Sequence, residues 1–386
     1  MKTVYVIGTC DTKEAELRYA VERVRVAGAH ALLVDISTAK SGATADVTLA
    51  TDLAITDRGQ AVAAMAEKLT AFLLSRNDIG AVLGLGGGGN TSMVTQAMRA
   101  LPIGVPKLMV STMASGNVAP FVGPTDIAMM HAVADVAGLN AITRQVIGNA
   151  AHAAAGMALN TVPAATGGKR AVGLTMFGVT TACITQIRAR IEDTCESYVF
   201  HATGTGGQCL EKLIESGLIT AALDITTTEV ADHLFGGVLP CTDDRFRAII
   251  RTRIPYVGSV GAVDMINFGA HDTVPPQYAT RNLYVHNAQV TLMRTTPDEN
   301  REIGAWIVER LNRMEGPVRF LLPLCGVSAI DAPGKPFHDP TAGAALFEAI
   351  RNGWTPAPSR QLIEIDAHIN DAAFADAAVA AFNDIT

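Results

Sequence analysis

The chain has few charged residues and no concentrated block of positive charge. Charged side chains make up 17% of its 386 residues, against about 25% in a typical soluble domain. The formal net charge is −7 and no basic run occurs, so we do not expect electrostatic binding to nucleic acid. No stretch of about 18 uninterrupted apolar residues occurs either, so we expect no membrane-spanning helix.

Patterns typical of common catalytic and metal sites are also absent. The six cysteines form no Cys-x-x-Cys pair, which suits the reducing cytoplasm and favours inert thiols. No His-Glu-x-x-His motif occurs, and no nucleophile elbow is recognisable. We therefore predict a cytoplasmic protein without a metal site of its own and without a serine hydrolase triad.

Apolar residues, in contrast, are abundant. They make up 49% of the chain, enough for a large core with apolar surface left over, which favours a homo-oligomer. A length of 386 residues exceeds what one core normally supports, so we expect two domains.

A glycine-rich turn between a strand and a helix is the most informative motif. Residues 79–83 form a short apolar run, residues 84–91 read Gly-Leu-Gly-Gly-Gly-Gly-Asn-Thr, and residues 92–100 have a helical pattern. Such a turn places main-chain N–H groups at the positive end of the helix dipole, where phosphate binds well. Glycine also lets the backbone approach a ligand closely. The alternative is a tight turn needed only for packing.

Two familiar phosphate-binding motifs do not fit this turn. The dinucleotide fingerprint requires an acidic residue about 20 positions further on, and residues 104–110 contain none. The Walker motif requires Gly-Lys-Ser/Thr, whereas Gly89 is followed by Asn90 and Thr91. A nicotinamide dehydrogenase and a P-loop ATPase are disfavoured, and a less common nucleotide or sugar-phosphate site stays open.

The first half of the chain alternates strands and helices. Strands are predicted at residues 3–8, 31–36, 79–83 and 105–110, with helices between them, as in a parallel doubly wound sheet. Ligands of such sheets lie at the carboxyl ends of the strands. The residues that follow these strands are therefore our candidates for nucleotide binding: Thr9, Asp11, Thr12, Lys13, Asp35, Gly86, Gly87, Gly88, Gly89, Asn90, Thr91, Ser111, Thr112, Ser115 and Gly116.

Several of these candidates have a simpler explanation. Asp11, Thr12 and the serines could cap helices or turns, and Lys13 could be solvated. Asp35 ends a strand where a carboxylate commonly meets ribose hydroxyls, but it could also form a turn.

The pattern of strands and helices restarts after a candidate linker at residues 164–169, so we expect domains at 1–168 and 169–386. Residues 256–268 have mixed strand character, and residues 283–286 are predicted to form a strand. Together these patterns predict an α/β fold with two Rossmann-like domains, each a mostly parallel sheet flanked by helices, and an interdomain cleft. Polar residues near the strand ends of the second domain suggest a substrate site: Thr175, Thr180, Thr181, His201, Thr203, Gly204, Gly206 and Gly207. Loops further along supply candidate catalytic groups: Asp331, His338, Asp339 and His368.

Several motifs resemble a family of largely uncharacterised proteins. They are residues 8–13 (Gly-Thr-Cys-Asp-Thr-Lys), 84–91, 282–287 with 291–296, 326–328 and 368–371. Plant members carry a similar region as the N-terminal, ATP-binding, virus-inhibiting part of a tobamovirus resistance protein. The resemblance spans the chain and implies two Rossmann-like domains, ATP with Mg²⁺ in the first, and a homodimer. Cys325 departs from the family pattern, where similar proteins tend to carry arginine.

These observations lead to three functional hypotheses. The first is an ATP-binding protein, and potentially an ATP-dependent enzyme that acts on a small polar metabolite in the cleft, with Mg²⁺ entering with the nucleotide. The second is a non-catalytic, nucleotide-dependent module that binds another protein. The third is an enzyme that needs no ATP and acts on a phosphorylated or acidic small molecule.

Overall fold

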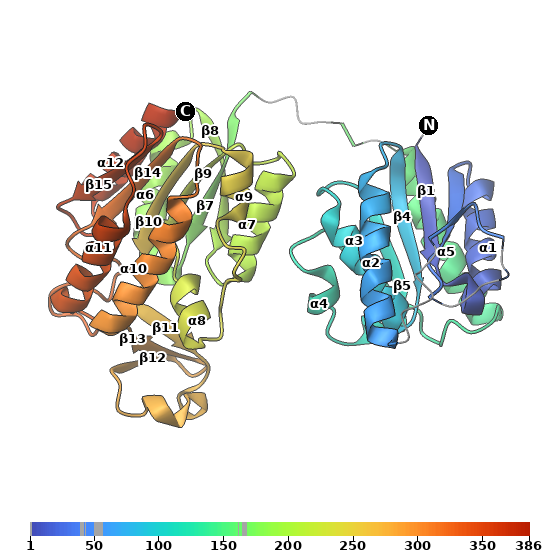
Figure 1. Cartoon of the computed structure of the whole chain (residues 1–386), viewed down its shortest axis with the longest axis horizontal. Coiled ribbons are helices and arrows are strands. Elements are labelled where there is room, and N and C mark those ends of the chain that lie inside the picture. The colour runs from blue at the N-terminus through green and yellow to red at the C-terminus, as the bar shows by residue number, and fades with distance from the viewer. Residues whose placement is uncertain (1, 39–41, 43, 50–56, 161, 164–167) are drawn as a thin grey trace. The chain divides into compact units, whose positions relative to one another are not determined.

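The chain divides into two compact units, an N-terminal unit (Met1–Thr166) and a C-terminal unit (Gly167–Thr386). Figure 1 shows both in a computed structural model that describes residues 2–38, 42, 44–49, 57–160, 162–163 and 168–386. The predicted linker at residues 164–169 lies largely outside the described residues. Each unit contains a six-stranded parallel sheet flanked by helices, which confirms the predicted fold class.

The sheet of the N-terminal unit has the order β3-β2-β1-β4-β5-β6. Its strands are β1 (Thr3–Gly8), β2 (His30–Asp35), β3 (Val47–Thr48), β4 (Ile79–Gly86), β5 (Lys107–Ser111) and β6 (Ile127–His131). Its helices are α1 (Cys10–Val26), α2 (Arg58–Leu74), α3 (Gly88–Ala100), α4 (Ala119–Val122) and α5 (Ala141–Leu159). Helices α1 and α5 cover one face of the sheet, and α2 and α3 cover the other.

The parallel sheet of the C-terminal unit has the order β15-β14-β10-β9-β7-β8. Its strands are β7 (Arg170–Met176), β8 (Cys195–His201), β9 (Ala221–Thr226), β10 (Tyr256–Gly261), β14 (Val318–Pro323) and β15 (Arg360–Ile365). Its helices are α6 (Thr181–Ile191), α7 (Thr205–Glu215), α8 (Glu229–Phe235), α9 (Arg247–Thr252), α10 (Pro297–Leu311), α11 (Pro340–Gly353) and α12 (Ala372–Ile385).

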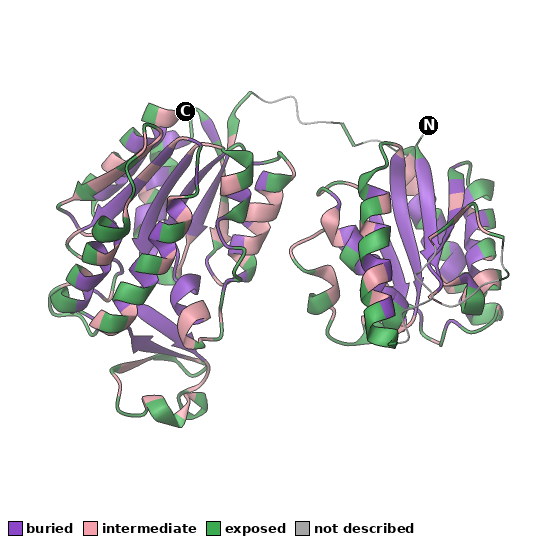
Figure 2. Ribbon diagram, in the orientation of Figure 1, coloured by how far each residue is buried: buried purple, intermediate pink, exposed green. Residues whose placement is uncertain are grey.

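Burial on both faces explains the continuous apolar runs in the central strands. Every residue of β1, β4, β9 and β10 is buried, and Figure 2 shows the central strands of each unit as its buried layer. Such runs are typical of parallel sheets that have helices on both faces. In the C-terminal unit, α6 and α12 pack on one face, and α7, α10 and α11 pack on the other.

Local signals in the sequence set the starts of several helices. At α10, Thr296 accepts a hydrogen bond from the Glu299 N–H and Glu299 accepts one from the Thr296 N–H, with Pro297 at the first helical position. At α11, the Asp339 carboxylate accepts from the Thr341 and Ala342 N–H groups. The reciprocal cap at α10 and the one-sided cap at α11 satisfy N–H groups that each helix itself leaves unpaired.

A small antiparallel sheet in the C-terminal unit is absent from the sequence-based prediction. It has the order β11-β13-β12, with β11 (Met265–Phe268), β12 (Leu283–Asn287) and β13 (Val290–Arg294). The prediction recognises strand character near β11 and β12 but not β13. No described helix has both the length and the apolar character needed to cross a membrane.

Candidate functional site

A cavity of about 330 Å³ lies at the carboxyl ends of the strands in the N-terminal unit. The chain builds β1, β2 and β3 outward on one side of β1 and then returns to place β4, β5 and β6 on the other side. Ligands of doubly wound sheets bind at this reversal. The cavity is lined by Thr9, Asp11, Thr12, Lys13, Thr38, Arg58, Val62, Gly87, Gly88, Gly89, Asn90 and Met93.

The glycine turn supplies bare main chain to this cavity. Strand β4 ends at Gly86 and α3 begins at Gly88, with no side-chain cap at Gly87. The first main-chain bond of the helix runs from the Thr91 N–H to the Gly87 carbonyl. The helix therefore provides no internal acceptor for the N–H groups of Gly88 and Gly89, and both residues are exposed.

Packing does not require glycine at three positions of this turn. A Cβ atom at Gly87 or Gly88 would come no nearer than 3.7 Å to another residue, and at Gly89 it would meet nothing within 4 Å. Gly84 differs, because a Cβ there would lie 2.5 Å from the Met109 sulfur. The open space beside Gly87, Gly88 and Gly89 favours a role in ligand approach over a role in packing.

Cationic side chains and the N-terminal ends of helices line the same cavity. Lys13 and Arg58 line it, and Asp11 is the single carboxylate among its lining residues. Arg58 stands at the first position of α2, whose N-cap Asp57 accepts a hydrogen bond from the Gln60 N–H. The N-terminal ends of α1, α2 and α3 thus all contribute residues to the wall, and each end carries partial positive charge. The cavity is suited to an anion.

The structure separates the predicted nucleotide-binding residues into three groups. Eight line the cavity: Thr9, Asp11, Thr12, Lys13, Gly87, Gly88, Gly89 and Asn90. Gly86, Thr91 and Ser111 are buried behind it, where the Thr91 and Ser111 hydroxyls lie 2.6 Å apart. Thr112, Ser115 and Gly116 form the turn after β5 and are not among the lining residues.

Asp35, also a predicted nucleotide contact, lies outside the cavity. It is 1% exposed and does not line the cavity. Its Oδ1 accepts hydrogen bonds from the Cys10 N–H (3.0 Å), the Ser37 N–H (2.9 Å) and the Ser37 hydroxyl (2.5 Å). The carboxylate therefore holds the start of α1 against the end of β2, and this geometry gives no support to a ribose contact.

Arg58 is a lining residue that the sequence-based prediction does not include. The sequence does contain a signal for Arg58. Asp57 is a residue type that caps helices, so a helix is expected to begin at the next residue, Arg58. Helix starts in such a sheet lie at the ligand-binding edge. Thr38, Val62 and Met93 also line the cavity without having been predicted.

The protein's own atoms fill the space around the glycines of the predicted substrate site. A Cβ at Gly206 would lie 1.9 Å from the His201 carbonyl oxygen, and one at Gly204 would lie 2.1 Å from the Pro240 carbonyl oxygen. At Gly207 it would lie 2.5 Å from Glu229 Oε1. These glycines allow close internal packing, so their presence does not indicate a ligand.

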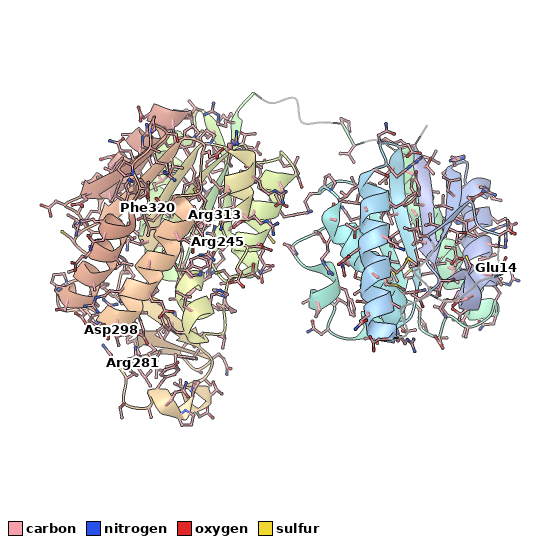
Figure 3. The ribbon with its side chains drawn as sticks, in the orientation of Figure 1. Glu14, Arg245, Arg281, Asp298, Arg313 and Phe320 are labelled. Carbon is pink, nitrogen blue, oxygen red and sulfur yellow. The ribbon has the colours of Figure 1, made fainter. Side chains whose placement is uncertain are left out.

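A buried arginine occupies the interior beside this turn. Arg245, labelled in Figure 3, donates to both Asp224 oxygens at 2.8 Å, to Glu229 at 2.8 Å and to Glu211 at 3.2 Å. Burial raises the pKa of Glu229 to about 7, although the Arg245 charge opposes the shift. One guanidinium thus faces three carboxyl groups in a site closed to solvent.

The other residues predicted for a substrate site are dispersed. Thr175 donates to Asp224 and Thr180 bonds with Thr226, and both are buried. Thr181 and His201 are exposed, and the His201 ring packs edge-on against Phe177. The Thr203 hydroxyl donates to the His201 carbonyl. These groups do not line either of the two cavities in which other predicted residues meet.

Three of the four predicted catalytic residues do come together. Asp331, His338 and Asp339 line a cavity of about 380 Å³ in the C-terminal unit, together with Cys325 and Arg351. His368 does not line it. Its Nδ1 accepts from the Asn370 N–H at 3.1 Å and its Nε2 lies 2.8 Å from the Ser328 carbonyl, so both ring nitrogens are used internally.

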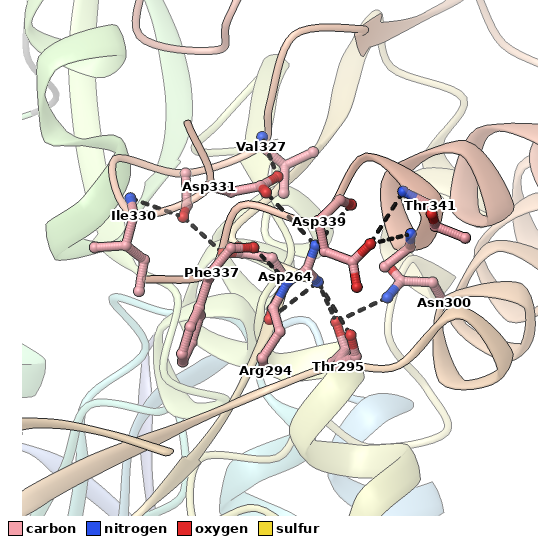
Figure 4. A network of polar contacts seen from close by, with 12 residues as sticks. Asp264, Arg294, Thr295, Asn300, Val327, Ile330, Asp331, Phe337, Asp339 and Thr341 are labelled. Carbon is pink, nitrogen blue, oxygen red and sulfur yellow. Dashed lines mark hydrogen bonds and ion pairs between the residues drawn. The ribbon is translucent and has the colours of Figure 1, made fainter. Parts of the chain in front are cut away.

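A polar network lies behind this second cavity (Figure 4). Arg294 donates to the Phe337 carbonyl at 2.7 Å and to Thr295 Oγ1 at 2.9 Å, and lies 3.5 Å from Asp331 Oδ1. Ser328 donates to Asp264 Oδ2 at 2.8 Å. Burial raises the pKa of Asp264 to about 7 and also raises that of Asp331, while Arg294 opposes both shifts.

Among the described residues, the cysteines form no disulfide and the possible metal ligands form no cluster. All six cysteines are free, and burial raises the pKa of Cys10, Cys183 and Cys241 to about 12 each, which fits the inert role expected of them. Across the described residues, no three histidine, cysteine or acidic side chains are placed to hold one metal ion.

Comparison with known proteins identifies the family. Residues 2–163 match the N-terminal domain, and residues 169–386 the C-terminal domain, of a group described as "Uncharacterised protein family (UPF0261)". The chain belongs to the UPF0261 family. A UPF0261 protein of Rhizobium meliloti is 52% identical to it, with 100% of this chain and 99% of that protein aligned.

A plant protein is also related to this UPF0261 chain. The ToMV resistance protein Tm-1(GCR237) of Solanum lycopersicum is 41% identical, and the alignment covers 99% of this chain but 56% of the tomato protein. The predicted family resemblance is thereby confirmed. Among solved structures, a UDP-GlcNAc 2-epimerase from Methanocaldococcus jannaschii aligns over 98% of this chain and 92% of that one. Its TM-score of 0.26 and its identity of 9% are too low for a functional argument.

Proposed function

We propose that the N-terminal unit binds a nucleoside triphosphate, ATP with Mg²⁺, through the cavity at the β1–β4 reversal. The observation that carries the proposal is the glycine turn, where Gly88 and Gly89 expose main chain to open space that packing does not use. Unpaired N–H groups at the start of α3 would bind phosphate oxygens, as helix N-termini commonly do. Lys13 and Arg58 add two cationic side chains to the same wall.

The lining residues also fit a magnesium ion that arrives with the nucleotide. Mg²⁺ usually keeps several waters and binds phosphate oxygens together with one or two carboxylates. Asp11 supplies one exposed carboxylate in the wall. The protein would position and neutralise the phosphates, and phosphoryl transfer to a small polar metabolite is the reaction that we propose for the bound ATP.

Calorimetry with ATP and Mg²⁺ on the full chain tests the binding proposal. We expect Arg58→Met and Lys13→Met each to weaken binding about tenfold, because each removes a charge-assisted contact to phosphate. Lys2→Met is the matched control, since Lys2 precedes β1 at the opposite end of the sheet and should leave the affinity unchanged. Tighter binding of a sugar phosphate than of ATP would favour the third hypothesis, an enzyme that needs no ATP.

The relation to a tomato protein named for ToMV resistance favours a second candidate function. In this alternative, the nucleotide controls docking onto another protein and is not consumed in a reaction. Phosphate release from ATP, measured alone and with candidate polar metabolites, separates the two. Turnover that a metabolite stimulates supports the enzyme, and the absence of turnover under every condition supports docking.

A further inference from the structure

The cavity in the C-terminal unit combines an apolar wall with one deeply set carboxyl group. One face of α11 forms the wall through Pro340, Gly343, Ala344 and Phe347, which recur at helical spacing. Opposite them lies the loop after β14, which contributes Asp331. The volume of about 380 Å³ is in the range of sites that hold small organic ligands.

The loop is built to present Asp331. A Cβ at Gly326 would lie 2.0 Å from the Asp331 carbonyl oxygen, so only glycine allows the loop to close this tightly. The Val327 N–H donates to Asp331 Oδ2 at 3.2 Å. Asp331 is 5% exposed, yet it lines the cavity. The part of this residue that a solute can reach is therefore the part that faces the cavity.

The buried carboxyl groups around Asp331 outnumber the buried cationic side chains there. Arg294, drawn with both residues in Figure 4, forms an ion pair with Asp331 and a hydrogen bond to the Asp264 main-chain carbonyl, and its charge acts on both carboxyl groups. Arg294 gives its shorter hydrogen bonds to the Phe337 carbonyl and to Thr295, and its ion pair with Asp331 spans 3.5 Å. Asp264 Oδ1 has no hydrogen-bond partner among the described residues. At a pH above their raised pKa values, buried carboxylates that lack full compensation attract a cation.

The arginine in the wall does not supply that cation, and His338, which also lines the cavity, adds positive charge beside Asp331 only when its imidazole is protonated. Arg351 Nε donates to Glu364 at 2.5 Å, and Asp339 adds a carboxylate that caps α11. We propose that this cavity binds a small molecule that has a positively charged amino group on an apolar body. The amino group pairs with Asp331, and the apolar body rests on Ala344 and Phe347. This inference is independent of nucleotide binding by the other unit.

Alkylation of Cys325 gives a direct measure of occupancy. Cys325 lines the cavity and is the exposed member of the six free cysteines. The rate of its modification by iodoacetamide is followed by peptide mass spectrometry, without ATP, in the presence of benzylamine, benzyl alcohol or benzoate. These probes share one apolar body and differ in charge. We expect benzylamine to slow alkylation at about tenfold lower concentration than benzyl alcohol, the factor typical of one charge-assisted hydrogen bond.

Two variants locate the effect, and a third controls for it. In Asp331→Asn the advantage of benzylamine over benzyl alcohol should disappear, whereas Asp193→Asn, at an exposed carboxylate of the same unit, should retain it. In case the Asp331 variant folds poorly, Ala344→Phe fills the cavity from the exposed face of α11 and should abolish protection by all three probes. The proposal is overturned if benzoate protects best, if no probe protects, or if benzylamine keeps its advantage in Asp331→Asn.

Discussion

Two glycine-rich turns, one in each unit, join a strand to a helix and differ in what surrounds them. Beside Gly87, Gly88 and Gly89, between β4 and α3, a Cβ would meet little or nothing. Where β8 leads into α7, a Cβ at Gly204 would lie 2.1 Å from the Pro240 carbonyl oxygen, and one at Gly206 would lie 1.9 Å from the His201 carbonyl oxygen. Similar glycine-rich sequences thus serve two purposes. The first turn leaves space for a ligand, and the second lets main-chain segments of the protein pack closely against each other.

The charged side chains near the two turns differ in the same way: those at the first turn line a cavity, and those at the second are buried and paired. Lys13 and Arg58 line the cavity at the open turn; Arg58 is exposed, and Lys13 Nζ donates to the Val136 carbonyl at 2.5 Å. At the packed turn, Gly207 approaches Glu229, which is already paired with Arg245 in the interior. A cation next to a glycine turn therefore indicates a ligand site only if solvent reaches both of them.

Removal of the buried cation should have the largest effect. Arg245→Met leaves Asp224, Glu229 and Glu211 without their shared partner, so we expect the free energy of unfolding to fall by about 3–5 kcal/mol. Urea unfolding followed by circular dichroism measures the change. Arg313→Met, at an exposed arginine of the same unit, is the control. Equal stability of the two variants would show that the packed turn does not depend on this network.

The same network predicts a pH dependence of stability. The folded state keeps the Glu229 proton up to about pH 7, whereas the unfolded chain releases it near the ordinary value of 4.5. Between these values the folded state binds more protons, so stability falls as pH rises. The loss attributable to Glu229 is on the order of 3 kcal/mol and is complete above about pH 7.

Glu229→Gln should flatten this decline, because the amide stays neutral at every pH. Unfolding by urea at about pH 5, 6 and 8 provides the comparison. Burial also raises the pKa values of Asp232 and Asp264, so part of the slope should persist in the variant. Glu192→Gln, at an exposed carboxylate, should follow the parent protein, and a Glu229 variant that does so too would refute the assignment.

A methyl group at the packed turn should destabilise the fold. Gly206→Ala forces a Cβ against the His201 main chain, which cannot rotate away, and we expect a loss of about 2–3 kcal/mol. Gly178→Ala is the matched control in the same unit, since its Cβ would meet nothing within 4 Å. Melting temperatures of the two variants give the answer, and a Gly206 variant as stable as its control would contradict the packing role.

A methyl group at the open turn should reduce binding without reducing stability. Gly89→Ala adds a Cβ where phosphate oxygens would approach the main chain, and we expect about tenfold weaker ATP binding, or about 1.4 kcal/mol. Its melting temperature should stay the same or rise slightly. Gly156→Ala, a helical position with equally open space, should leave ATP affinity unchanged while its melting temperature rises slightly. Unchanged ATP affinity in Gly89→Ala would remove the distinction between the two turns.

Sequence patterns predict the layers of the fold because they are local. Buried runs such as β1 and β4 follow from composition and spacing over a few residues, whereas α3 begins at Gly88, four residues before the start of the predicted helix at 92. The order of strands then predicts which edge holds the ligand, and eight predicted residues do line the cavity there. Strand β13 escapes prediction although only two residues separate it from β12, one of its two antiparallel partners; the other partner, β11, is more distant in the chain.

The environment of each glycine and carboxylate, in contrast, depends on contacts between distant segments. Pro240 closes the space at Gly204 from 36 residues away, and no local pattern signals this approach. Asp35 ends a strand as a ribose-binding carboxylate would, but Cys10 and Ser37 use its Oδ1. Arg245 has no motif around it, and the folded chain alone shows that its partners are Asp224, Glu229 and Glu211.

The side chain of Asn90 has a consequence for the kinetics of the open turn. Its amide donates to the Leu85 carbonyl at 3.1 Å and to the Thr9 hydroxyl at 3.2 Å, and so links the loop after β1 to the turn after β4. The two walls are fixed to each other before any anion enters, which lowers the entropic cost of association. Related anions should therefore enter at similar rates, and their residence times should account for most of the differences in affinity.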